Sequence, residues 1–327
     1  MYGKSVKADT YISRTYRIEA ELGSGGSGAV YKAWHTRLRK HVVIKIVNNS
    51  SAGTIEVRRN EVEALKCIRN LYVPQVLDFL TEGDYSFSVM EYIDGESFDK
   101  LLRRGMKFTQ AQILKWYSQL ASALDAIHTH KVYHRDIKPS NIMLSTNDDV
   151  FLIDFNSALV SGNNTGVISR SMGYASPEQY EYFKICRDAF ADSAKFYSYN
   201  IETVLIENDC ITERISLANK TGYQNTNTPF IANAFSSGRT PGSPAPQYLS
   251  SSAINWDLSD IYSLGATMYH FLTKKRPPVK ADEIARIPYL EGYSRGLLKI
   301  IEKSMKQYPQ DRYQTAAKLG LAVKRVT

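Results

Sequence analysis

The chain has 327 residues, 43% of them hydrophobic and 23% charged, with a formal net charge of +8. This composition is typical of a soluble globular protein, and the length allows two lobes or domains. No apolar run approaches the roughly 20 residues that cross a membrane, and residues 1–17 lack the apolar core of a secretion signal. We therefore expect no membrane segment in this chain.

The cysteines and the positive charge narrow the setting further. Cys67, Cys186 and Cys210 are far apart and form no C-x-x-C pair, which favours a reducing compartment and a cytoplasmic location. The charge could favour acidic protein substrates, nucleic acid or an anionic membrane surface, but a solvated surface with a basic cleft explains it better. No Lys/Arg run has interleaved aromatic residues, so we expect no nucleic-acid partner.

Tyr16 to Trp34 alternate apolar and polar residues around a glycine cluster, which predicts two strands joined by a turn. The turn carries the pattern Gly23-x-Gly25-x-x-Gly28-x-Val30. Glycines let a backbone approach phosphate oxygens closely and present N–H groups to them. The pattern alone is weak, because most Gly/Ser-rich turns bind nothing. Strands on both sides favour a loop over ATP, since a dinucleotide-binding fold would continue into a helix.

The run from His41 to Val47 is a predicted strand with a lysine, Lys45, at its centre. A lysine in an apolar run needs an anionic partner, such as nucleotide phosphates or a carboxylate on the following helix. We expect that helix over 56–69, and spacing alone leaves Glu56, Glu61 and Glu63 open as the partner of Lys45.

Two more strands are predicted at 75–80 and 85–93. The apolar pattern is then lost over 89–95, as in a hinge between two lobes, where the backbone of Glu91 and Ile93 could meet an adenine edge. Further along, Thr109-x-x-Gln112 is a capping box that opens a long helix. The apolar positions of this helix follow at spacings of three and four and predict core packing: Ile113, Tyr117, Leu120, Leu124 and Ile127.

The most informative stretch is the octapeptide 134–141, HRDIKPSN, read with Asp154-Phe155-Asn156. Transfer of a phosphoryl group from ATP needs a carboxylate that orients a hydroxyl, a cation for the moving phosphate, and oxygen ligands for Mg²⁺. Asp136, Lys138, Asn141 and Asp154 supply this set. Few sequence signals are as specific.

These residues resemble the eukaryotic-type (Hanks-type) protein kinase family over Tyr16 to roughly Lys318, apart from one insertion. The run 173–179, GYASPEQ, and the run 260–265, DIYSLG, look most like bacterial serine/threonine kinases. The resemblance implies an α+β, two-lobed fold, with a small antiparallel β-rich N-lobe carrying one main helix and a larger, mostly helical C-lobe. We place an N-terminal extension at 1–15, the N-lobe at 16–90 and the C-lobe at 91–327.

By this resemblance the chain phosphorylates serine and threonine hydroxyls of protein substrates. Asp136 and Lys138 would be catalytic, and Asn141 and Asp154 would hold Mg²⁺, or Mn²⁺ in its place. The expected nucleotide-binding residues are Leu22, Gly23, Gly25, Gly28, Val30, Val43, Lys45, Glu61, Met90, Glu91, Ile93 and Met143.

The resemblance also assigns regulatory and architectural roles. Arg135 suggests control by a phosphate on the activation segment 154–178. The segment offers five hydroxyl residues, of which Thr165 or Ser169 is the preferred site and Ser171 is structural: Ser157, Ser161, Thr165, Ser169 and Ser171. Asp260 is expected to anchor the catalytic-loop backbone, and Glu178 and Arg312 to form a buried ion pair.

Three features depart from the family pattern. Asn156 replaces the glycine after Asp154-Phe155; asparagine tolerates left-handed backbone, so we expect reduced flexibility rather than lost metal binding. Val43 replaces the usual alanine and narrows the adenine pocket. An insertion of about 180–255 separates Glu178 from Asp260. Its first part, 182–206, has near-helical apolar spacing, and 219–252 predicts a poorly ordered loop.

The insertion is predicted either to recruit a substrate or partner, or to pack on the large lobe as a tolerated excursion. For the whole chain the alternatives are an ATP-binding pseudokinase scaffold, which Asn156 and Val43 favour, and a kinase of small molecules. Lys138 and Ser176-Pro177-Glu178 argue against the second.

Overall fold

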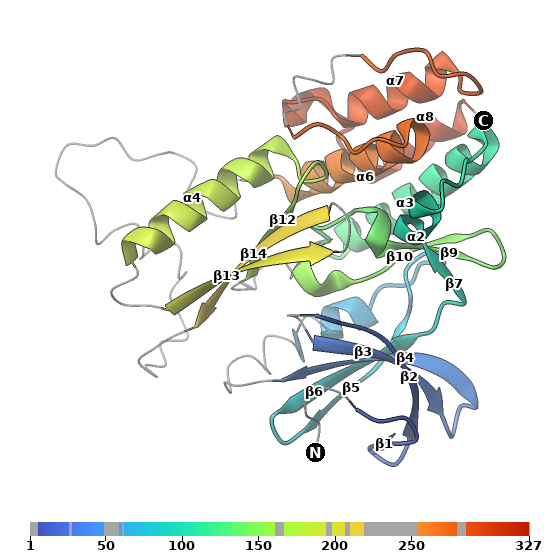
Figure 1. The fold of residues 1–327 in the computed structure, drawn as a ribbon. Coiled ribbons are helices and arrows are strands. Elements are labelled where there is room, and N and C mark those ends of the chain that lie inside the picture. The colour runs from blue at the N-terminus through green and yellow to red at the C-terminus, as the bar shows by residue number, and fades with distance from the viewer. Residues whose placement is uncertain are drawn as a thin grey trace.

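The computed structural model describes residues 6–25, 28–48, 59–60, 62–160, 167–193, 198–206, 210–218, 254–279 and 286–326. They form a β-rich small lobe and a mostly helical large lobe, drawn below and above in Figure 1. The predicted α+β, two-lobed architecture is confirmed.

The small lobe is one antiparallel sheet in the order β1-β2-β3-β4-β6-β5. Its strands are β1 (Tyr11–Ile12), β2 (Tyr16–Gly25), β3 (Gly28–His35), β4 (Lys40–Asn48), β5 (Val76–Glu82) and β6 (Tyr85–Glu91). Alternate residues of β3, among them Tyr31 and Ala33, are buried together with Ile44 and Phe87. This alternation explains why the run folds as strands, because only one face of the sheet meets the core.

The described part of the predicted N-terminal extension packs on the small lobe, and its strand β1 belongs to the same sheet. Val6 and Ile12 are buried in the small-lobe core, and β1 pairs with β2. The backbone N–H of Val6 donates to the hydroxyl of Tyr31 at 3.0 Å. Residues 6–12 therefore pack as part of the lobe.

Helical backbone is described at 59–60 and 62–66, inside the predicted helix 56–69. Cys67 already lies in a turn, so the helix ends earlier than predicted. Glu56 and Glu61 lie outside the described residues. Glu63 pairs with Lys66 on the helix surface, with Oε1 and Nζ 2.8 Å apart.

The large lobe is built around the long helix α3 (Gln110–Thr129) and helix α6 (Trp256–Thr273). The capping box at the start of α3 is confirmed: Thr109 Oγ1 accepts from the Gln112 backbone N–H, and the Gln112 side chain accepts from the Thr109 N–H. All five residues of its predicted apolar stripe are buried. Helices α2 (Phe98–Arg103), α7 (Arg295–Ser304) and α8 (Ala316–Lys324) complete the helical part.

Short strands and turns, most of them between α3 and helix α4 (Pro177–Ser193), carry the predicted chemistry. Strand β8 (Val132–Tyr133) pairs with β11 (Leu159–Val160), while β7 (Gly95–Ser97), β9 (Ile142–Ser145) and β10 (Val150–Leu152) form a second small sheet. Two 3₁₀ turns, η1 (Pro139–Asn141) and η2 (Phe155–Ser157), interrupt them. This arrangement brings the segments 134–141 and 152–157 together.

The insertion has a structure that was only partly predicted. Helix α4 (Pro177–Ser193) is followed by strands β13 (Ser198–Ile206) and β14 (Cys210–Ala218), which pair with β12 (Val167–Ser171) in the order β12-β14-β13. The predicted helical spacing over 182–206 is therefore wrong beyond α4. Residues 198–206 form a strand because the whole of β13 pairs with β14. The spacing of apolar residues within β13 alone does not reveal this pairing.

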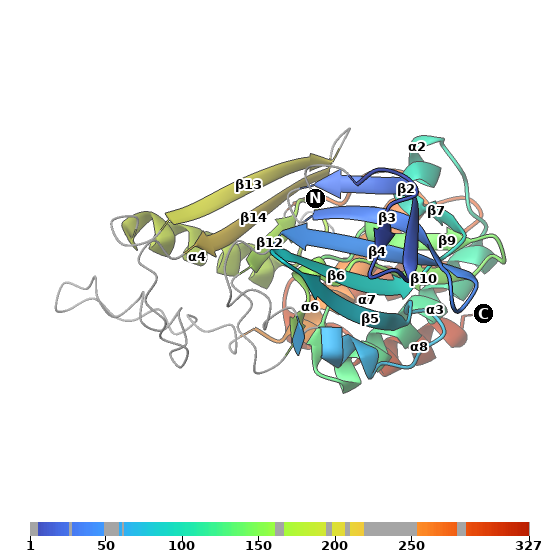
Figure 2. The same cartoon turned by 90° about the horizontal axis from the view of Figure 1, so that it is seen from below.

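Figures 1 and 2 show this hairpin running outward from the large lobe beside α4. The predicted loop over 219–252 lies outside the described residues. Among the residues that the structure describes, none of the helices has the length and apolar character needed to cross a membrane.

Candidate active site

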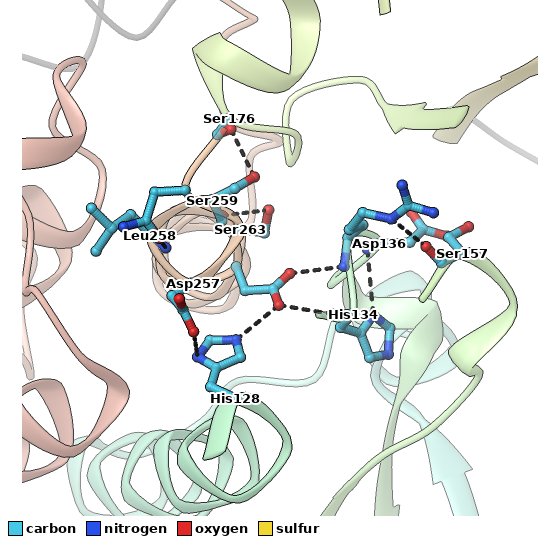
Figure 3. Close-up of polar contacts among 12 residues, drawn as sticks. His128, His134, Asp136, Ser157, Ser176, Asp257, Leu258, Ser259 and Ser263 are labelled. Atoms are coloured by element: carbon cyan, nitrogen blue, oxygen red, sulfur yellow. Dashed lines mark hydrogen bonds and ion pairs between the residues drawn. The ribbon is translucent and has the colours of Figure 1, made fainter. Parts of the chain in front are cut away.

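The loop that carries the candidate catalytic residues is anchored by hydrogen bonds to one buried carboxylate. Asp260 is fully buried in α6 and accepts hydrogen bonds from the backbone N–H groups of His134 and Arg135, both at 2.8 Å. Its Oδ2 also lies 3.0 Å from His128 Nε2, and the other ring nitrogen of His128 lies 3.2 Å from Asp257 (Figure 3). The anchoring role predicted for Asp260 is confirmed.

The backbone of this loop is constrained as well as anchored. Arg135 has a positive φ of 61°, an uncommon value for a side chain of its size. The two bonds to Asp260 hold the peptide groups on either side of His134, and so fix the backbone that enters this strained residue. The His134 ring contacts the carbonyl of Ile153 at 3.0 Å and so joins the loop to the segment before Asp154.

Asp136, Lys138 and Asn141 form a buried cluster with Ser171. Lys138 Nζ donates to Asp136 Oδ2 at 2.9 Å, and Asn141 Nδ2 donates to the Asp136 carbonyl at 2.7 Å. Ser171 Oγ donates to Asp136 Oδ1 at 2.5 Å and accepts from Lys138 Nζ at 3.1 Å. Ser171 thus contacts the catalytic loop, in agreement with the structural role predicted for it.

Asp154 links this cluster to the small lobe. Its Oδ1 lies 3.8 Å from Nζ of Lys45, whose side chain in β4 is only 11% exposed. Asp154 has a φ of 63°, in the left-handed region. The segment after it is therefore turned at Asp154, while Asn156 lies in the right-handed turn η2. The asparagine in place of glycine is accommodated without positive φ.

The glycine-rich strands lie beside Lys45. Gly23 is paired with Val30, and Val30 with Lys45, while Gly25 and Gly28 face each other where β2 and β3 meet. Gly28 has a φ of 120°, and an added Cβ would lie 2.3 Å from the carbonyl oxygen of Ile46. Glycine is therefore required there by the close approach of β4. Residues 26–27, at the tip, lie outside the described residues.

The residues predicted to surround the adenine come from both lobes. Val43 in β4 is paired with Met90 in β6, and both are half-buried. The Glu91 N–H donates to the Gln75 carbonyl at 2.9 Å, so this amide is already used. Ile93 is buried just beyond β6. Leu22 is 50% exposed near the end of β2, and Met143 lies in β9 of the large lobe.

The segment between Asp154 and Glu178 is held at several points. Nε of Arg135 donates to the Ser157 carbonyl at 2.6 Å, and its guanidinium lies over the Trp256 ring. Ser157 is buried, and Ser169 lies in β12. Ser161 and Thr165 lie outside the described residues. Phosphorylation at Thr165 or Ser169 stays a prediction.

Two contacts fix the far end of this segment. Arg312 is buried and binds both carboxylate oxygens of Glu178, at 2.6 and 2.9 Å, which confirms the predicted ion pair. The sequence did not predict the second contact, in which the buried Gln179 side chain donates to the Arg135 carbonyl at 2.8 Å. Its position directly after the Ser-Pro-Glu triplet was the available signal, but no local pattern points to Arg135.

Comparison with known proteins agrees with this geometry. The sequence profile of the protein kinase domain matches residues 16–202, more than half of the chain. The chain therefore belongs to the protein kinase domain family. The match ends inside β13, so β14 lies beyond it.

Several curated relatives are serine/threonine kinases by name. A protein named "Probable serine/threonine-protein kinase" from Clostridium acetobutylicum is 33% identical over 186 residues, covering 54% of this chain and 28% of that protein. The serine/threonine-protein kinase pkn2 of Myxococcus xanthus is 32% identical over 201 residues, 58% of this chain and 24% of that protein. The carbon catabolite-derepressing protein kinase of Saccharomyces cerevisiae is 30% identical over 180 residues, 54% of this chain and 28% of that protein. The matched part thus spans about a quarter of each relative.

Proposed function

We propose that this chain is a serine/threonine protein kinase that transfers the γ-phosphoryl group of ATP to hydroxyls of protein substrates. The observation that carries the proposal is the buried cluster of Asp136, Lys138 and Asn141, whose loop is anchored by Asp260. The Ile153 N–H donates to the Asn141 carbonyl and so joins this cluster to the segment of Asp154, which pairs with Lys45. Family membership and the names of the relatives support it. The alternative is an ATP-binding pseudokinase scaffold, which Asn156 and Val43 favour.

Each group in the cluster has a proposed task. Asp136 orients the substrate hydroxyl and takes its proton, and Lys138 neutralises charge on the transferred phosphoryl group. Lys45 binds the α- and β-phosphates of the nucleotide. Leu22, Val30, Val43, Met90, Ile93 and Met143 would enclose the adenine and ribose from both lobes.

A divalent cation fits the remaining donors. The side chains of Asn141 and Asp154 offer oxygen ligands, which Mg²⁺ and Mn²⁺ prefer. Once bound, such an ion would neutralise phosphate charge between the two residues. Within the described residues no group of three or more His, Cys, Asp or Glu side chains is placed to hold a metal.

Regulation, partners and location extend the proposal. We infer autophosphorylation of the activation segment, with Thr165 or Ser169 as its sites. The insertion of about 180–255 is the proposed docking region for a partner. Cys67 and Cys186 are free thiols, which supports the expected reducing, cytoplasmic setting.

The test is transfer of labelled phosphate from ATP and Mg²⁺ to a generic basic protein substrate. The wild type should incorporate label, and Asp136→Asn should lower the rate by about 10²-fold or more. A parallel measurement of ATP binding by thermal shift separates the alternatives. Binding without transfer by the wild type would establish the pseudokinase and overturn the proposal.

A further inference from the structure

The insertion reaches the active site through strand pairing. Strand β14 pairs along the whole of β12, from Val167 opposite Ser216 to Ser171 opposite Thr212. Strand β12 is the part of the activation segment that leads directly into the candidate catalytic cluster. The hairpin thus occupies one edge of the segment that positions Ser171 (Figures 1 and 2).

The position of β12 is defined on two further sides. Ser171 at its end is bound to Asp136 and to Lys138, at 2.5 and 3.1 Å. Arg170, one residue earlier, lies over the rings of Phe183 and Tyr180 in α4, with its guanidinium carbon 4.4 and 5.2 Å from the ring centres. Because β12 is held in this way, the pairing register shows which residue of β14 lies opposite Ser171, the contact of Asp136.

Among the residues of β14 that pair with β12, Thr212 is the one that lies opposite Ser171, the residue bonded to the Asp136 carboxylate. Directly opposed residues of an antiparallel pair have Cα atoms about 4.5–5.5 Å apart. Thr212 is therefore one strand spacing from Ser171, whose hydroxyl contacts Asp136. The other hydroxyl residue within the β12–β14 pairing on β14, Ser216, lies four residues away, about 13 Å along the strand.

We propose that β14 is an intramolecular substrate strand and that Thr212 is phosphorylated in cis by the site that it adjoins. The inference rests on the proposed kinase function and adds a modification site to it. The family match ends at residue 202, inside β13, so β14 lies beyond the matched region.

The reaction balances with ATP as the co-reactant. The hydroxyl oxygen of Thr212 forms a bond to the γ-phosphorus, and the bond from that phosphorus to the oxygen bridging the β- and γ-phosphates breaks. ADP leaves with the electron pair of the broken bond, and the hydroxyl proton passes to the Asp136 carboxylate. The product carries a phosphate of about −1.5 to −2 charge at Thr212.

The test follows phosphate at single residues of the full chain. Phosphatase-treated protein is incubated with ATP and Mg²⁺ over a twentyfold range of protein concentration, and phosphopeptides are quantified by mass spectrometry. Phosphate should appear at Thr212 with a first-order rate constant that does not change with concentration. It should be lost in Thr212→Val, retained in Ser216→Ala and absent in Asp136→Asn.

Two further arms make the outcome decisive. Mass-labelled Asp136→Asn protein mixed with the wild type should remain unphosphorylated at Thr212, because the transfer is intramolecular. Phosphate on that labelled chain, or a rate that rises with concentration, would overturn the cis mechanism. Transfer to an external substrate with no phosphate at Thr212 would overturn the inference and leave the kinase function intact. No transfer to any acceptor would overturn both.

Discussion

A carboxylate oxygen of Asp260 lies 2.8 Å from the backbone nitrogen of His134, although 126 positions separate the two residues. Helix α6 therefore sets the position of the loop that holds Asp136. The second oxygen of the same carboxylate accepts from the Arg135 N–H, so both donors are satisfied by one buried group.

Asp260→Asn should impair the site more than the nucleotide contacts. One of the two backbone N–H groups would then face an amide NH₂ in a buried position, which costs about 2–4 kcal/mol of unfolding free energy. Phosphate transfer should fall at least tenfold with ATP affinity nearly unchanged, measured by kinetics and calorimetry. Asp257→Asn is the matched control, since Asp257 contacts the same His128 from a more exposed position. Equal losses in the two variants would contradict the anchoring role.

Gly173→Ala should destabilise the activation segment, and Gly105→Ala should do so much less. Both glycines have positive φ, 84° and 73°. An added Cβ at Gly173 would lie 2.6 Å from the Pro277 carbonyl oxygen, whereas at Gly105 it meets nothing within 4 Å. Strain alone costs about 1–2 kcal/mol at Gly105, and the overlap at Gly173 adds about 1–3 kcal/mol. Urea unfolding measures the loss of unfolding free energy in each variant. Similar losses would contradict the prediction, because they would show that the backbone at residue 173 shifts away from Pro277 at no cost.

Arg312→Lys should cost more stability than its counterpart Arg295→Lys. The Arg312 fork binds both oxygens of Glu178 and donates to carbonyls of Leu258, Lys306 and Gln307. Lysine cannot reproduce this geometry in a buried position, so we expect a loss of about 3 kcal/mol. Arg295 pairs with Glu302 from a side chain that is 36% exposed, and its replacement should cost under about 1 kcal/mol. Thermal or urea unfolding of both variants gives the two losses of unfolding free energy. A smaller loss for Arg312→Lys than for Arg295→Lys would contradict the prediction.

His270 should make the fold sensitive to acid. Burial lowers its pKa from 6.5 to about 4, and the nearby Arg276 and Lys274 cations add to the effect. The folded state therefore holds His270 neutral, with Nδ1 2.6 Å from the Tyr174 hydroxyl. Its contribution is complete above pH 6.5, where the unfolded histidine is also neutral, and is lost as pH falls toward 4.

His270→Gln removes this titration while keeping a polar group beside Tyr174. Between pH 7 and pH 5 the wild type should lose roughly 1–2 kcal/mol more unfolding free energy than the variant. Carboxylates that titrate in both proteins cancel in the difference. Identical pH dependence of urea unfolding in the two proteins would rule out His270 as the source.

Val43→Ala should leave ATP affinity unchanged or improve it. Val43 is half-buried at the predicted adenine site, and removing two methyl groups widens that site. Val42→Ala next to it is the control, because Val42 is fully buried in the small-lobe core and its truncation should cost about 2 kcal/mol of stability. Calorimetric titration with ATP measures the affinity of Val43→Ala, and urea unfolding measures the stability of Val42→Ala. A large loss of affinity in Val43→Ala would refute the placement.

The features predicted best depend on short stretches of chain. The capping box of α3 and the stripe of buried residues after it follow from local hydrogen bonding and helical periodicity. The set from Asp136 to Asp154 was recognised because its spacing is short and its residue types are specific to one chemistry. The roles of Asp260, Glu178 and Arg312 were predicted from the family resemblance, since nothing local links residues so far apart.

The sequence by itself determined which residue types the site contains, the two-lobed fold class and the family. Tertiary structure alone decided that Gln179 reaches Arg135, that Gly28 is required by the approach of Ile46, and that β14 pairs with β12. The physical reason is that strand pairing and buried hydrogen bonds join segments whose separation in sequence carries no periodic signal. Thr212 lies next to Ser171 only because a hairpin from the insertion folds back onto the activation segment.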